Sequence, residues 1–163
     1  MKNRRLFLLF FLSVVLAVSL DSCKKAEVLN TFGFAVDAKD FKDRIEKAGG
    51  FKVDGGAQIV DIRSRDLYVK GHIKGAVNIP MTYNKTNGDL VFEGEEKLES
   101  FDTHKPIFVY GDDDTKGARV ASYMVDFGFS KSTTCYLSGG FNKWETTNKG
   151  DSSYEITTGE SRW

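Results

Sequence analysis

Residues 106–129, PIFVYGDDDTKGARVASYMVDFGF, decide the fold of this chain. The β-branched and aromatic run at 107–110 predicts a buried strand. A helix is predicted after it by apolar residues at helical spacing: Val120, Met124 and Phe127. Residues 111–117 form a tight loop that opens this helix. In open α/β sheets, ligands bind at the carboxyl ends of strands, where helix amides can hold anions, so this loop is the expected place for chemistry.

The composition of the loop is unusual for such a site. Reactions at a strand-to-helix turn commonly use a thiolate, because the helix amides lower its pKa. The loop contains no Cys, Ser or His, and sets three aspartates against one lysine. We expect it to repel anions. Its members are Gly111, Asp112, Asp113, Asp114, Thr115, Lys116 and Gly117.

The aspartates have two interpretations. Carboxylates at a helix N-terminus accept hydrogen bonds from amides that lack partners and meet the favourable end of the helix dipole. A metal site is the alternative, but consecutive aspartates lack the alternating spacing and distal Glu of a calcium loop. We expect capping, with no metal ion and no cofactor.

Length and charge limit the class of protein. The 163 residues suit one domain with an ordinary core. The 23 basic and 23 acidic side chains balance and are scattered. The sequence therefore lacks the basic patch with which proteins usually bind nucleic acid, and we expect no nucleic-acid partner. We expect a monomer.

The N-terminus has the layout of a secretory signal, because Lys2, Arg4 and Arg5 precede an apolar run at 6–20. As a helix, this run would extend roughly 22 Å, short of the ~30 Å hydrocarbon core of a bilayer. It ends in Leu20, Asp21, Ser22 and Cys23, which resembles the lipobox of bacterial lipoproteins.

The lipobox resemblance implies cleavage before Cys23 and lipidation of its thiol, although Asp21 is unusual for the pattern. Two or more acyl chains hold a protein stably to a bilayer. We therefore expect a protein exported to the bacterial cell envelope and lipid-anchored to a membrane, facing the periplasm or the surface. The alternative is an ordinary cleaved signal in which Cys23 is incidental.

Cysteine usage is simple if Cys23 is lipidated. Cys135 is then the only thiol of the mature chain, so no internal disulfide can form. Cys135 falls within a predicted strand, which favours a small buried apolar residue over a nucleophile.

Strands and helices alternate along the chain, which predicts parallel pairing with right-handed crossovers. Strands are expected at 34–36, 58–62, 76–79 and 133–137, and helices at 38–48, 66–69, 95–101 and from 141. Asn87 and Gly88 suggest a small hairpin. From Thr146 we expect a polar, frayed end that Tyr154, Ile156 and Trp163 could pin in part. The expected organisation is a signal at 1–22, a tether at 23–33, a domain at 34–148 and a polar tail at 149–163.

Two blocks carry a resemblance to a known family. Residues 59–80, IVDIRSRDLYVKGHIKGAVNIP, resemble the first signature of rhodanese-like domains, and residues 107–144 are similar to the strand, active-site loop, helix and ending of that family. The matching positions are Asp61, Arg63, Tyr68, Gly71, His72, Ile73, Gly75, Ala76, Asn78, Pro80, Gly128, Phe129, Leu137, Gly139, Gly140 and Trp144.

The resemblance implies one α/β domain with a five-stranded parallel sheet and helices on both faces. Active members pass sulfane sulfur through a persulfide on a loop cysteine. Counting back 17 residues from Gly128 places that cysteine at Gly111, where no persulfide can form. Asp114, Lys116 and Gly117 also replace the usual glycine, arginine and serine, so the loop fits neither an active sulfurtransferase nor a related phosphatase.

The remaining signature residues are expected to be structural. Asp61 and Arg63 are interpreted as a structural ion pair or hydrogen-bonded set, with Asp66 as a possible third member. The imidazole of His72 could be a base, but the glycines around it, Gly71 and Gly75, suggest that it ties the loop backbone in place. His104 is expected to be exposed.

These patterns favour a binding or regulatory module without sulfurtransferase activity, with a protein or small-molecule ligand that the sequence does not name. An enzyme of altered chemistry, using the Cys135 thiol or a metal on the acidic loop, is the second hypothesis. A purely structural envelope domain is the third.

Overall fold

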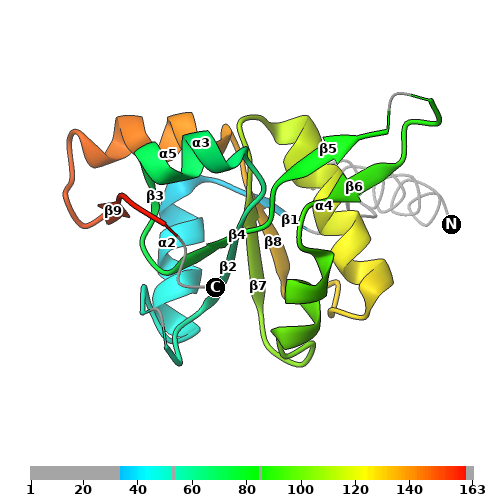
Figure 1. Cartoon of the computed structure of the whole chain (residues 1–163). Helices are drawn as coiled ribbons and strands as arrows, with labels where there is room; N and C mark the ends of the chain where they lie inside the picture. The colour runs from blue at the N-terminus through cyan, green and yellow to red at the C-terminus, as the bar shows by residue number, and fades with distance from the viewer. Residues whose placement is uncertain (1–33, 53, 85, 161–163) are drawn as a thin grey trace, which may run out of the picture.

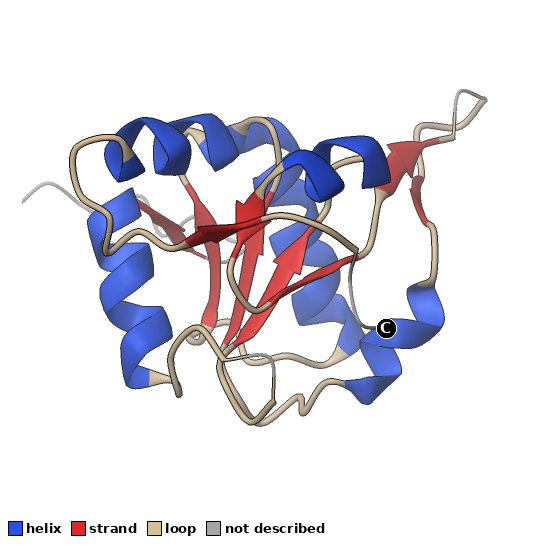
Figure 2. Ribbon diagram, turned by 60° about the vertical axis from the view of Figure 1, so that its left-hand side comes forward, coloured by secondary structure: helices blue, strands red, loops and turns tan. Residues whose placement is uncertain are grey.

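A five-stranded parallel sheet between two layers of helices forms the body of the protein (Figures 1 and 2). The computed structural model describes residues 34–52, 54–84 and 86–160. The strands, in spatial order, are β1 (Phe34–Val36), β8 (Thr134–Leu137), β7 (Ile107–Tyr110), β2 (Gln58–Asp61) and β4 (Ala76–Asn78). All four pairings are parallel, which confirms the predicted fold class.

Helices cover both faces of the sheet. Figure 1 shows α2 (Ala38–Lys47) on one side and α4 (Asp114–Phe127) on the other, with α3 (Arg65–Lys70) and α5 (Gly140–Asn148) at the upper end. The short 3-10 helix η1 (Glu95–Ser100) lies beside α4. Each strand of a parallel sheet therefore meets apolar side chains on both sides, which is why its residues read as a continuous apolar run.

Strand β7 shows this burial directly, because its four residues are all buried. Phe108 and Tyr110 belong to the core that contains α2 and α5 side chains, whereas Ile107 and Val109 belong to the core under α4. β7 thus contributes side chains to both hydrophobic cores.

Helix α4 begins earlier than predicted, and its last residue is more exposed than predicted. It begins at Asp114, so the connecting loop is only residues 111–113. Val120 and Met124 are fully buried, but Phe127 is 36% exposed and stacks between Tyr123 and Phe129 at ring-centroid distances of 6.3 and 6.2 Å. Phe127 is the last residue of the helix, and its ring packs on other aromatic rings and not in the buried core.

Two small antiparallel sheets flank the main one. β5 (Met81–Tyr83) pairs with β6 (Leu90–Phe92), which confirms the predicted hairpin, although its turn is longer than Asn87 and Gly88 alone. β3 (His72–Ile73) pairs with β9 (Ile156–Thr157).

The C-terminal segment corrects the expectation of a frayed end. α5 continues to Asn148, and Asn148 Nδ2 donates to the Tyr154 carbonyl at 2.6 Å. Tyr154 is buried with its ring edge-on to Trp144, at 4.9 Å between centroids. Tyr154 and Ile156, which the sequence suggested as partial anchors, hold this segment to the domain. Trp163 lies outside the described residues.

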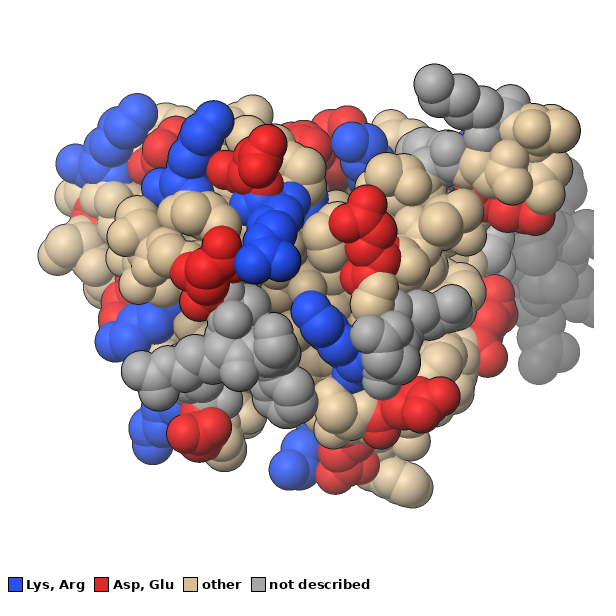
Figure 3. Space-filling view, in the orientation of Figure 1, with Lys and Arg blue, Asp and Glu red and all other residues tan. Residues whose placement is uncertain are grey.

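The predicted signal, lipobox and tether lie at 1–33, outside the described residues. Within the described ranges, no helix combines the length and apolar character needed to span a membrane. Figure 3 shows basic and acidic side chains interspersed on one face of the molecule, which agrees with the scattered charge of the sequence.

Candidate functional site

The loop after β7 lies at the carboxyl end of the sheet, and two of its carboxylates are engaged with α4. Asp113 is the N-cap residue, and its side chain accepts a hydrogen bond from the Lys116 amide at 3.0 Å. The Asp112 carboxylate lies 3.3 Å from the Lys116 ammonium. The expected capping is therefore present, and the lysine of the loop is neutralised within it.

The third carboxylate of the loop, that of Asp114, contacts the turn before another helix. Asp114 accepts a hydrogen bond from the Gly139 amide at 2.5 Å and a weaker one from the Ser138 hydroxyl at 3.4 Å. Ser138 and Gly139 form the turn between β8 and α5. Asp114 therefore ties the start of α4 to the start of α5, a contact between residues 25 positions apart.

Gly111 sits against the side chain of Ile62, which directly follows β2. A Cβ atom at Gly111 would lie 3.0 Å from Ile62 Cγ1 and 3.1 Å from Cδ1. Ile62 is 1% exposed. The side chain of Ile62 therefore fills the space into which a side chain at position 111 would extend.

Gly140 holds the loop from the other side, which the sequence did not reveal. Its φ is +58°, and a Cβ there would lie 2.6 Å from the carbonyl oxygens of Gly111 and Asp112. The Phe141 amide donates to the Gly111 carbonyl at 2.9 Å. Only glycine allows this approach, so the pair Gly139 and Gly140 was the available signal.

Asp61 and Arg63 form the predicted ion pair beneath the site. The guanidinium contacts both carboxylate oxygens, with Nη2 2.6 Å from Oδ2, and donates to the Gly71 carbonyl at 2.7 Å. Its carbon lies 3.8 Å from the centroid of the Phe141 ring. Asp66, the possible third member, is exposed. The third partner of the Arg63 guanidinium is instead the Gly71 carbonyl. Burial raises the pKa of Asp61, and Arg63 opposes that rise.

Tyr110 completes this buried cluster. Its hydroxyl accepts a hydrogen bond from the Ile73 amide at 3.0 Å, and its ring lies 5.5 Å from the Arg63 guanidinium carbon. Burial raises the pKa of Tyr110 well above its usual value. The phenol is therefore neutral and serves to connect β7 with β3.

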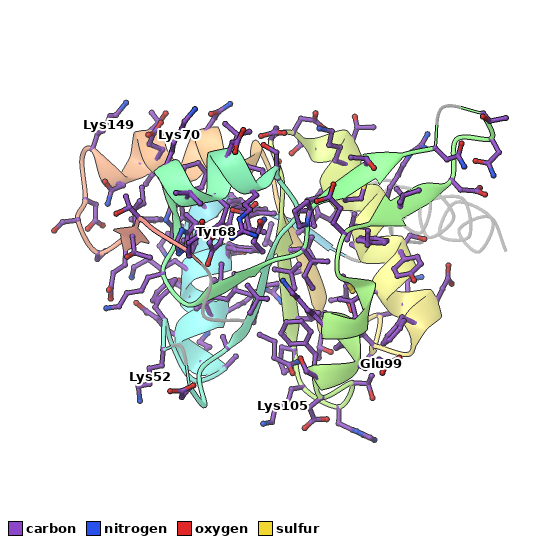
Figure 4. The ribbon with its side chains drawn as sticks, viewed as in Figure 1. Lys52, Tyr68, Lys70, Glu99, Lys105 and Lys149 are labelled. Carbon is purple, nitrogen blue, oxygen red and sulfur yellow. The ribbon has the colours of Figure 1, made fainter. Side chains whose placement is uncertain are left out.

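His72 lies within the same part of the fold. Its Nδ1 is 2.9 Å from the Tyr68 carbonyl, and its ring stacks on the Tyr68 ring at 3.7 Å. Burial lowers the pKa of His72. In Figure 4, Tyr68 points into the molecule, whereas Lys70 on the same helix points outward. Gly75, at φ +81°, turns the chain between β3 and β4.

A cavity of about 220 Å³, the loop-side cavity, opens between this loop and β5. Its lining includes exposed Leu67, and Arg65 at its rim pairs with Glu160 at 2.8 Å. The charges that line it are of both signs: Arg63, Arg65, Glu93, Asp112 and Lys116. This mixture gives the loop-side cavity no strong preference for an anion.

Cys135 is far from the loop. It lies in the first half of β8, opposite Phe108 of β7, and is 2% exposed. Burial raises the pKa of its thiol, while Arg44, with Nη1 3.9 Å from Sγ, opposes the rise. Across the described residues, no group of three His, Cys, Asp or Glu side chains is placed to hold a metal ion. His104 is exposed, as expected.

Known proteins share both the sequence pattern and the fold. Residues 37–147 match the family described as Rhodanese-like domain. The chain is 32% identical over 107 residues to a Pseudomonas fluorescens protein described as thiosulfate sulfurtransferase GlpE, covering 66% of this chain and 84% of that protein. It is 30% identical over 88 residues to a Bacillus subtilis protein described as uncharacterized protein YqhL, covering 54% of this chain and 60% of that protein.

Solved structures agree. A rhodanese-related protein of Thermoplasma volcanium superposes with a TM-score of 0.53 at 19% identity, covering 76% of this chain and 96% of that one. The rhodanese-like domain of the Alr3790 protein of Anabaena gives a TM-score of 0.52 at 26% identity, covering 79% and 83%. The sheet order, the buried signature residues and the family match lead to one conclusion: this chain belongs to the rhodanese-like domain family.

Proposed function

We propose that this chain is a membrane-anchored rhodanese-like domain that acts as a binding or regulatory module and does not transfer sulfur from its loop. The observation that carries the proposal is Gly111 packed under Ile62. Transfer through a persulfide requires a sulfur atom at the reacting position, and position 111 has none.

The electrostatics of the loop support the same proposal. An active site for a dianion such as thiosulfate needs donors that are free to meet the developing charge. Here the Lys116 amide, the Lys116 ammonium and the Gly139 amide already donate to the carboxylates of Asp113, Asp112 and Asp114. The carboxylates of the three aspartates therefore bind the donors that a bound anion would otherwise use.

The test is turnover of thiosulfate and cyanide by the purified full chain. We expect no thiocyanate above the protein-free rate, with the Pseudomonas sulfurtransferase as the positive control. Turnover above that rate that Cys135→Ser abolishes would contradict the proposal, because Cys135 is the cysteine of the described residues.

The binding role is assigned to the loop-side cavity. Leu67 is 39% exposed at its rim, and large apolar side chains exposed beside a cavity are common at binding sites. Chemical cross-linking in solubilised membranes, followed by mass spectrometry, should give products that Leu67→Glu reduces several-fold. The matched control is Lys105→Glu, at the opposite end of the sheet in Figure 4. An equal loss of cross-linked products in both variants would show that the loop-side cavity is not the binding site.

The membrane anchor is a separate part of the proposal, motivated by the lipobox-like Leu20–Asp21–Ser22–Cys23. We expect radioactive palmitate fed to bacteria that express the full chain to label the wild type and not Cys23→Ser. Labelling of Cys23→Ser would contradict lipidation at this residue.

A second candidate is sulfur transfer through Cys135. Arg44 beside the thiol favours it, as does the similarity to a protein named as a thiosulfate sulfurtransferase. The Cys135 thiolate would attack the outer sulfur of thiosulfate, release sulfite and become a persulfide, which cyanide would convert back with formation of thiocyanate. Turnover abolished by Cys135→Ser would establish this candidate and displace the first.

A further inference from the structure

A second cavity, of about 210 Å³, lies at the end of the sheet opposite the loop, and we call it the amino-end cavity. Pro106 and Thr133, which directly precede β7 and β8, line it together with Phe108 and Cys135. The last turn of α2 contributes Arg44 and Lys47. Lys105, labelled in Figure 4, marks this end of the molecule.

The two cations of the amino-end cavity, Arg44 and Lys47, differ from the other basic residues of α2 in their ion pairing. Lys39 and Lys42 each pair with an acid four residues on, Asp43 at 2.8 Å and Glu46 at 2.7 Å. In the part of the chain that the structure describes, neither Arg44 nor Lys47 forms an ion pair. Their positive charge is therefore available to a ligand.

The orientation of Arg44 strengthens this point. Asp40 precedes it by four residues, a spacing that permits a helical ion pair. The guanidinium turns instead toward the sheet, where its Nη1 lies 3.9 Å from Cys135 Sγ. Because burial raises the pKa of Cys135, the thiol is neutral at pH 7 and does not compensate the guanidinium.

Cations in the last turn of a helix are favoured by the helix dipole, and this alone could explain basic residues at the end of α2. The dipole explains their position along the helix, but it requires neither a cavity beside them nor contact with the sheet. Here the cations border a hollow whose floor is apolar, since Phe108 is 1% exposed and Pro106 lies beside it.

We propose that the amino-end cavity binds a small organic monocarboxylate, with its carboxylate between Arg44 and Lys47 and its hydrocarbon chain against Phe108 and Pro106. Charge-assisted hydrogen bonds from a guanidinium and an ammonium are strong ligands for a carboxylate. The ligand is small because the volume is below the ~300–1,000 Å³ of pockets for drug-sized molecules. This site is at the opposite end of the sheet from the loop, so the proposal does not depend on whether the loop transfers sulfur.

The experiment uses sodium hexanoate as the probe, with hexanol as its neutral counterpart and acetate as its counterpart without a chain. Calorimetric titration of the full chain should give saturable binding of hexanoate, and binding of hexanol and acetate at least about tenfold weaker. Arg44→Gln with Lys47→Gln should weaken hexanoate binding at least about tenfold. Lys39→Gln, on the same helix but away from the cavity, should leave it unchanged.

Location is tested by protection of Cys135. A small methylthiolating reagent is applied to the full chain, and the Cys135 peptide is followed by mass spectrometry. Hexanoate should slow modification several-fold in the wild type and not in the double variant; if Cys135 does not react at all, the calorimetric comparison decides. Equal binding of hexanol and hexanoate, unchanged binding by the double variant, or no binding of hexanoate would each overturn the proposal.

Discussion

Position 111 shows how one residue changes what a site can do. Gly111 removes the side chain that would react, and Ile62 packs into the adjoining space, 3.0 Å from where a Cβ would stand. The backbone frame around it is kept, because the Gly111 carbonyl still accepts from Phe141. Loss of a nucleophile therefore needs no rearrangement of the fold.

Restoring the thiol should have a small effect unless the charges change too. We predict that Gly111→Cys alone gives little thiosulfate turnover, and that the same change with Asp112, Asp113 and Asp114 each replaced by Asn raises the rate by at least about tenfold. Asn keeps the capping geometry of Asp113. Thiocyanate formation is the measurement, and equal rates in the two variants would show that the charge of the loop is unimportant.

His72 should make stability depend on pH. Burial lowers its pKa in the folded state, so the unfolded chain binds more protons as the pH falls below about 6.5, the ordinary value of the imidazole. The stabilising contribution of neutral His72 is present above that pH and is lost on acidification. We expect the free energy of unfolding, measured in urea, to fall from pH 7 to pH 5.

His72→Gln should reduce this pH dependence, and His104→Gln is the matched control because His104 is exposed. If His104→Gln flattened the profile as much as His72→Gln, the burial of His72 would not be the cause.

Several residues were predicted correctly from their type and position. Capping by Asp113 follows from local spacing, and burial of Cys135 follows from the apolar run around it. The bond from Gly139 to Asp114 and the contact of Ile62 with Gly111 join separate segments of the chain. Local patterns carry no information on such contacts, so the sequence could not predict them.

Among the elements, the turn between β8 and α5 supports the loop most closely. Gly140 adopts φ +58° and touches the carbonyls of Gly111 and Asp112. A Cβ at position 140 would be strained at this φ and would clash with both carbonyl oxygens, so the close approach of this turn to the loop depends on glycine.

We predict that Gly140→Ala destabilises the protein by at least about 2 kcal/mol, through backbone strain and the clash with the loop. Gly150→Ala is the control, since its Cβ would make an ordinary 3.7 Å contact with the Thr147 carbonyl. Chemical denaturation measures both. Similar stabilities for the two variants would mean that the turn and the loop separate easily.

At the scale of the molecule, alternation of strands and helices was sufficient to predict the parallel sheet. The C-terminal segment was not predicted well, because its fold depends on Tyr154 packing on Trp144 and on β9 pairing with β3. Such distant partners leave only isolated apolar residues in a polar stretch as a sequence signal.

The C-terminal segment should contribute to stability. We predict that Tyr154→Ala lowers the free energy of unfolding by about 2–4 kcal/mol, because a buried aromatic ring is removed. Ser152→Ala, at an exposed neighbouring position, should change it by less than about 0.5 kcal/mol. Thermal unfolding followed by circular dichroism measures the stability of both variants. Equal effects would show that Tyr154 does not hold the C-terminal segment to the domain.

Sulfur loading of the described domain can be measured by mass spectrometry of the full chain after incubation with thiosulfate and removal of the excess. We predict that peptides from residues 34–160 carry no additional sulfur atom. A Cys135 peptide that gains one sulfur atom, and loses it again when cyanide is added, would contradict it.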